Sequence, residues 1–223
     1  MSRGIAFLAV VLGSLALFFL VWGIRALIFW FKERARSALL RNHAAKLGFE
    51  YVRSDGTKHL AYEDAALWQQ HLCSETANIL QGETDEGKLA YFDYRGAVAD
   101  RGIYMSVCAC NTGYMFRRLV LRMRHGLLGN DLARLLRAKP IALESAAFNN
   151  AFEVECEDKK FAYDILHQRA MEFLLDRPQI QMQLFGNCVF FWYERRLPIE
   201  GVESFIADTR EFARMLPRYL AER

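Results

Sequence analysis

The first thirty residues constrain this chain more than any other stretch, because they contain a long run without a charged side chain. The run extends from Ile5 to Ile24. At a helical rise of ~1.5 Å per residue, about 20 apolar residues match a hydrocarbon core ~30 Å thick. Lipid offers the backbone no hydrogen-bond partner, so such a run must form a helix there. We therefore expect residues 1–31 to be a transmembrane anchor.

A cleaved signal peptide is the alternative interpretation of this segment. Signal peptides have an apolar core of about 7–15 residues followed by a small-x-small cleavage site. Here the apolar core is longer, and it runs into Trp22, Arg25, Trp30 and Lys32 without such a site. These features favour an anchor that is retained in the mature protein.

Lys and Arg lie mainly on the C-terminal side of the apolar run, and this asymmetry predicts its orientation. Only Arg3 precedes the run. The side chains expected at the cytoplasmic membrane surface are Arg25, Lys32, Arg34, Arg36 and Arg41. Residues 32–47 are predicted to form a basic juxtamembrane helix, whose charges either bind an anionic leaflet or only fix the topology. The expected protein is a single-pass protein of the inner (plasma) membrane, with residues 48–223 in the cytoplasm.

The composition indicates an ordinary globular domain after the anchor. Charged residues make up 25% of the chain, and a net charge of +3 is too small to favour nucleic acid as a partner. The five cysteines are an odd number, and their spacing is unlike that of a disulfide-stapled secreted module. This cysteine pattern favours a reducing compartment.

Short apolar runs separated by turn signals predict a mainly antiparallel sheet in residues 48–223. The expected strands are residues 49–52, 77–83, 88–95, 103–110, 116–124, 141–143, 152–156, 180–185 and 188–193. The last two are expected to form a hairpin around Gly186-Asn187. Helical spacing predicts helices at 60–72, 131–137, 158–175 and 202–216, and Asp158 is expected to cap the third of them. The predicted fold is therefore α+β, with an N-terminal transmembrane helix followed by a mainly antiparallel sheet with helices packed on it.

Residues 143–220 resemble the C-terminal part of an uncharacterised family of bacterial membrane-anchored proteins. The resemblance is carried by Leu143-Glu144-Ser145, by the Phe-x-x-x-Phe-x-Val pattern of residues 148–154, and by the segment from Asp158 to Leu175. In that family the Phe-x-x-x-Phe-x-Val strand leads to an acidic cap and an Ala- and Leu-rich helix. The family has no established activity. The resemblance therefore implies the layout and a bacterial origin, and it assigns no catalytic residue.

Few residues suggest a catalytic site or a metal site. Cys108 and Cys110 share one face of a predicted strand, but a structural zinc site needs two more ligands, and no second cysteine pair occurs. His167 has Asp164 one turn earlier and is interpreted as a helix histidine paired to its neighbour. Neither a nucleophile at a recognisable turn nor a glycine-rich phosphate loop accompanies them. We expect no catalytic residue, no metal site and no cofactor.

A candidate interaction surface is formed by Arg118, Arg122, Arg124 and Trp192. The three arginines alternate with apolar residues, so they share one face of their strand, and the alternative is that they protect a sheet edge. Residues 189–193 are apolar on both strand faces, which favours a strand covered on both sides over one that faces a partner.

Three functions fit these features. The leading hypothesis is a membrane-anchored protein that presents a cytoplasmic protein-interaction domain. The alternatives are a membrane-associated enzyme with an unidentified pocket and a sensor of anionic lipid surfaces. The expected partners are the lipid bilayer and a protein, and no nucleic acid is expected.

Overall fold

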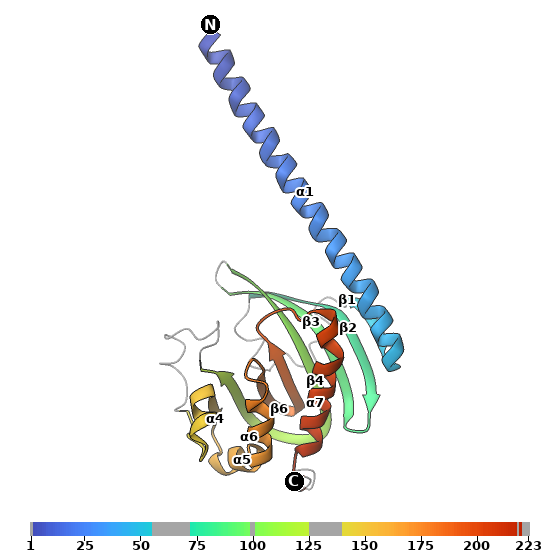
Figure 1. The fold of residues 1–223 in the computed structure, drawn as a ribbon, viewed down its shortest axis with the longest axis vertical. Coiled ribbons are helices and arrows are strands. Elements are labelled where there is room, and N and C mark those ends of the chain that lie inside the picture. The colour runs from blue at the N-terminus through green and yellow to red at the C-terminus, as the bar shows by residue number, and fades with distance from the viewer. Residues whose placement is uncertain (1, 55–71, 99–100, 125–139, 218, 220–223) are drawn as a thin grey trace. The chain divides into compact units, whose positions relative to one another are not determined.

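The computed structural model describes residues 2–54, 72–98, 101–124, 140–217 and 219 (Figure 1). The chain divides into two compact units, Met1–Leu40 and Arg41–Arg223, and each is considered by itself. The predicted helices at 60–72 and 131–137 lie, apart from residue 72, outside the described residues.

The first helix, α1, extends from Ser2 to Leu47 without interruption. It therefore combines the predicted anchor and the predicted juxtamembrane helix in one element. Among the described residues it is the single helix long and apolar enough to cross a membrane, with a mean hydropathy of 2.1 over an 18-residue window. The helix ends where predicted, at Gly48, which has a φ of +70°. The Phe49 and Gly48 amides donate to the carbonyls of Ala44 and Ala45, a common helix-ending arrangement.

A six-stranded sheet forms the centre of the second unit in the described part of the chain. Its strands are β1 (Glu50–Ser54), β2 (Leu72–Thr84), β3 (Gly87–Val98), β4 (Arg101–Met123), β5 (Phe152–Cys156) and β6 (Gln181–Tyr193). The order is β1-β2-β3-β4-β5, and β6 also pairs with β4. Every strand pair is antiparallel. The predicted α+β fold is confirmed.

The predicted hairpin around Gly186 is wrong, because residues 181–193 form the single strand β6. The predicted break at Asn111–Gly113 is wrong for the same reason, since β4 runs through it. The two positions face each other: the β4–β6 register is irregular between Asn111 and Phe116, opposite Gly186 and Cys188. Residues typical of turns here form an irregularity shared by two long paired strands, which bends a ladder without ending it.

The helices of the second unit lie on one side of the sheet (Figure 1). They are α4 (Ala146–Ala151), α5 (Lys159–Ile165), α6 (Gln168–Leu175) and α7 (Val202–Met215), with a short 3-10 turn at Ile199–Gly201 before α7. The prediction of one helix over 158–175 is wrong, because Leu166 and His167 separate two helices. The His167 imidazole accepts a hydrogen bond from the Ala170 amide and so caps α6. This break gives each short helix its own direction while both bury their apolar residues.

Helix α7, whose extent was predicted, packs aromatic side chains on the sheet. Phe205 lies against Tyr193, with ring centroids 5.0 Å apart. Phe212 lies against Phe191 at 5.1 Å and against Phe173 of α6 at 5.8 Å. Because Phe212 is fully buried, this contact joins two helices and a strand in one core.

Further apolar side chains form a second cluster on β3, β4 and β6. Its members include Phe92, Tyr94, Met105, Val107, Phe190 and Trp192, all buried. Strand β6 therefore contributes buried residues to both clusters, which explains why its last residues are apolar without alternation. Of the predicted strand 141–143, only the bridge from Ile141 to Val154 is formed.

Candidate functional site

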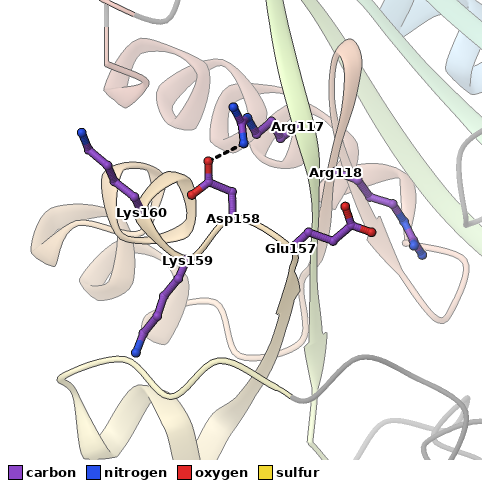
Figure 2. Close-up of a pocket in the computed structure, with 6 residues that line it drawn as sticks. All are labelled: Arg117, Arg118, Glu157, Asp158, Lys159 and Lys160. Atoms are coloured by element: carbon purple, nitrogen blue, oxygen red, sulfur yellow. Dashed lines mark ion pairs between the residues drawn. The ribbon is translucent and has the colours of Figure 1, made fainter.

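A pocket of about 550 Å³ lies where β5 ends and α5 begins, beside β4. Charged side chains line it, namely Arg117, Arg118, Glu157, Asp158, Lys159 and Lys160. Figure 2 shows these residues, and the name basic pocket is used for them below. Four cations and two carboxylates give the lining a net charge of +2.

Asp158 lies at the centre of the basic pocket (Figure 2). Its carboxylate accepts a hydrogen bond from the Phe161 amide at 3.1 Å, so it caps α5 as the sequence predicted. The same carboxylate lies 2.6 Å from Nη1 of Arg117. The Phe161 hydrogen bond, assisted by the Arg117 charge, lowers the pKa of Asp158. The carboxylate therefore stays ionised at neutral pH, and its charge is engaged within the protein.

The remaining cations of the pocket are exposed. Among the described residues, Arg118 and Lys160 form no ion pair, and Lys159 lies 5.8 Å from the ring centroid of Tyr163. In Figure 2 these three side chains point away from one another. Their arrangement suits a broad contact with a large partner better than the enclosure of a small anion.

The arginines of β4 continue from this pocket along the strand. Arg122 lies 3.9 Å from Glu155, and Arg124 lies 3.7 Å from Glu153. Arg124 also donates two hydrogen bonds to the carbonyl of Asn149. These pairs join β4 to β5.

The alternative prediction for the arginines, that they protect a sheet edge, is wrong. Residues Leu119–Leu121 pair with β5 on one side and β6 on the other. Here β4 is therefore an internal strand of the sheet.

The four residues predicted as an interaction surface thus have different environments. Arg118 and Arg124 are exposed, and Arg122 is 17% exposed. Trp192 is 3% exposed and belongs to the second apolar cluster. Of these four, Arg118 alone also lines the basic pocket. Lys159 and Lys160, which directly follow the predicted helix cap, were missed; two lysines after an acidic cap were the available signal.

The residues predicted at the membrane surface all lie on α1. Arg25, Lys32, Arg34 and Arg41 are exposed, while Arg36 is partly buried. In the first unit the Arg34 guanidinium lies 5.1 Å from the Trp30 ring centroid, and in the second unit Arg41 lies 5.2 Å from the Tyr51 ring centroid. Both are cation–π contacts.

Two of the thiols, those of Cys108 and Cys110, lie where they react poorly. Cys108 and Cys110 are buried, and burial raises the pKa of both, that of Cys110 to about 12. A thiol with a raised pKa forms little thiolate, the reactive species. Within the described ranges, no group of three or more His, Cys, Asp or Glu side chains is arranged to hold a metal.

His167 has a structural role in this fold. Its Nδ1 accepts a hydrogen bond from the Ala170 amide at 3.4 Å, and its Nε2 lies 3.2 Å from the Met215 carbonyl oxygen. The imidazole therefore links the start of α6 to the end of α7. The predicted pairing with a neighbour on one continuous helix does not form, because His167 lies between two helices.

A buried polar network was missed by sequence reasoning. Asp93 of β3 accepts hydrogen bonds from Asn78 at 2.9 Å, Tyr91 at 2.9 Å and Arg196 at 3.2 Å. Asn78 has a φ of +54°, a conformation that costs free energy for most residues. The network fixes the segment after β6 to the sheet. A charged residue on the otherwise apolar face of Leu89 and Tyr91 was the available signal.

Comparison with known proteins gives one similar solved structure. No family model matches the chain, and no curated protein matches it. The crystal structure of the mycobacterial trehalose monomycolate transport factor A, TtfA, is similar, with a TM-score of 0.54 and 14% sequence identity. The match covers 81% of this chain and 96% of that one. At this identity the likeness shows the fold alone, a domain of the same α+β arrangement.

Proposed function

We propose that this chain is a single-pass inner-membrane protein whose C-terminal domain lies in the cytoplasm and binds a protein partner. The exposed, unpaired cations of the basic pocket are the observation that carries the proposal. The pairs that hold the domain together engage most other charges near them, such as Arg124 with Glu153. A surface whose charges the fold does not use is available for recognition.

The membrane half of the proposal rests on α1. Its apolar stretch is long enough for one crossing, and Lys and Arg follow it rather than precede it. In this arrangement Arg25, Lys32, Arg34, Arg36 and Arg41 contact the cytoplasmic headgroups. Membership of the bacterial membrane-anchored family suggested by residues 143–220 belongs to the same proposal.

The partner is proposed to be a protein at the same membrane. An anchored domain meets such partners at a high effective concentration, because both are confined to one surface. TtfA is a transport factor by name, and an accessory role in transport across or along the membrane is the class of process that we propose for this chain.

Photo-crosslinking in intact cells tests the proposal. Benzoylphenylalanine would replace Arg53, Arg118, Lys160 or Arg169 in turn, four exposed positions on different parts of the domain. A covalent adduct with a protein, strongest at Arg118 and Lys160, is expected. The proposal fails if none of the four positions gives a protein adduct in cells that contain the full-length chain in the membrane.

A further inference from the structure

We infer that the basic pocket binds an acidic segment of a partner protein in which carboxylates are interspersed with uncharged residues. This inference rests on the proposed function and names the chemistry of the partner. It concerns Arg117, Arg118, Lys159 and Lys160 on the cationic side, with Glu157 and Asp158 between them.

The pocket attracts anions through its side chains rather than through a helix terminus. The Asp158 carboxylate already accepts the hydrogen bond of the Phe161 amide and engages Arg117. Within the described structure, Arg118, Lys159 and Lys160 form no ion pair with a carboxylate, although the Lys160 charge also acts on Asp158. The net charge of +2 is therefore carried by groups that are free to pair with a ligand.

The shape of the pocket favours a polypeptide over a bilayer. A recess of about 550 Å³ that has carboxylates among its cations admits the separate side chains of a polypeptide. The exposed Glu157, which lies between Asp158 and Arg118 in Figure 2, would repel a uniformly anionic surface. An extended peptide avoids this repulsion by placing an uncharged residue opposite Glu157.

The hydrogen-bonding geometry of the cations also favours a polypeptide with separated carboxylates. Arg118 presents a planar fork that binds a carboxylate with two hydrogen bonds, and the lysines add point charges. In Figure 2 Arg118 lies on the opposite side of Asp158 from Lys160. Carboxylates that pair with both must be separated along the partner chain. The partner segment therefore has uncharged residues between its carboxylates rather than an unbroken acidic run.

Binding to defined probes tests the inference. The full chain in nanodiscs of neutral phosphatidylcholine would be titrated with a fluorescein-labelled peptide in which glutamates alternate with serines. The test variant carries Arg118→Glu and Lys160→Glu. The matched control carries Arg53→Glu and Arg169→Glu, two exposed cations outside the pocket. Both variants change the net charge equally, and both are expected to melt at the temperature of the unmodified chain.

We expect the test variant to bind the peptide about tenfold more weakly or worse, with a smaller dependence on salt, and the control to bind nearly as the unmodified chain does. Equal losses in both variants would overturn the inference, because net charge alone would then explain binding. Tighter binding of phosphatidylglycerol vesicles or of single-stranded RNA through Arg118 and Lys160 would also overturn it. Crosslinks to a protein at Arg53 or Arg169 alone would overturn the inference and leave the proposed function standing.

Discussion

Glu86 ties together parts of the domain that are far apart in the sequence. It lies in the turn between β2 and β3, and its side chain is 4% exposed. Its carboxylate accepts hydrogen bonds from Arg210 at 2.7 Å and from Arg214, both on α7. Burial by itself would raise the pKa of Glu86, but the two arginines outweigh that effect and lower it from 4.5 to about 2. The tip of the hairpin is thereby fixed to the last helix.

Replacing Glu86 with Gln is expected to lower the free energy of unfolding by about 1–3 kcal/mol at pH 7, because charge-assisted hydrogen bonds are lost. The folded-state pKa lies below 4.5, so the contribution of Glu86 is fully present above that pH and is lost as the pH falls toward about 2. The difference between the two proteins should therefore shrink over this range, as measured by urea unfolding.

Glu83→Gln in the same hairpin is the matched control, since Glu83 is 75% exposed and lies 3.7 Å from Lys88. Its effect is expected to stay within about 0.5 kcal/mol. Equal destabilisation by the two substitutions would contradict the role given to Glu86.

Single-residue features were predictable where their partners are local. Asp158 was identifiable as a helix cap because it bonds the Phe161 amide three residues later. The partners of Glu86 are more than a hundred residues away on α7, and those of Asp93 lie on three segments. Nothing in the local sequence indicates such pairings, and the basic pocket is likewise assembled from two segments that meet only in the fold.

Gly186 allows strand β6 to adopt a left-handed backbone conformation at one position. It has a φ of +57° in the middle of β6, opposite the irregular part of β4. A Cβ at this position would meet nothing within 4 Å. The requirement for glycine therefore comes from the backbone conformation and not from crowding.

Gly186→Ala is expected to destabilise the domain by about 1–2 kcal/mol, the cost of a left-handed conformation for an ordinary residue. Gly186→Asn should cost less, because asparagine tolerates that conformation better. Gly102→Ala on β4 also has open space and no positive φ, and it should stay within about 0.5 kcal/mol. Thermal unfolding of the three variants provides the comparison, and an effect of Gly102→Ala equal to that of Gly186→Ala would rule out the backbone explanation.

Helix α7 is an integral part of the core. Phe212 is fully buried between Phe191 and Phe173. Phe212→Ala is expected to lower the free energy of unfolding by about 3–5 kcal/mol, as is usual for emptying a core aromatic site. Glu211→Ala, on the exposed side of the same helix, should cost less than about 1 kcal/mol. Denaturant titration measures both, and similar midpoints for the two variants would show that α7 packs less tightly than the structure has it.

Elements were predictable where periodicity continues, as in α7, and less so where it is interrupted. Gly186-Asn187 and Asn111–Gly113 have turn composition, yet the pairing of β4 with β6 carries both strands through these positions. The helical pattern of residues 158–175 likewise continues across Leu166 and His167, where the chain leaves the helix. Composition shows where a chain can bend, and tertiary pairing determines whether the bend ends the element.

At the scale of the whole molecule, the fold class was predictable from two sequence patterns that do not depend on the exact bounds of single helices or strands. One is the uncharged run in α1, which is long and apolar enough to cross a membrane. The other is a succession of short alternating strands, which implies an antiparallel sheet. Both survive errors in individual elements, which is why the α+β arrangement was predicted although β4 and β6 were each predicted as two strands, α5 and α6 as one helix, and α4 not at all.

The orientation of the anchor is the last prediction, and it depends on charge asymmetry across the apolar run. In a bacterial host, a fluorescent protein fused after residue 223 should fluoresce, and alkaline phosphatase fused at the same place should be inactive. Changing Lys32, Arg34, Arg36 and Arg41 to Gln while changing Ser2 to Lys removes the asymmetry. Phosphatase activity should then rise, because part of the population inserts in the opposite orientation.

The control has the same number of Gln substitutions, at Arg53, Lys88, Arg95 and Arg169. These positions lie far from the span in sequence, so both reporters should stay unchanged. Active phosphatase and a dark fluorescent protein on the unmodified chain would place the domain on the other side of the membrane, and the cytoplasmic partner would then have to be abandoned.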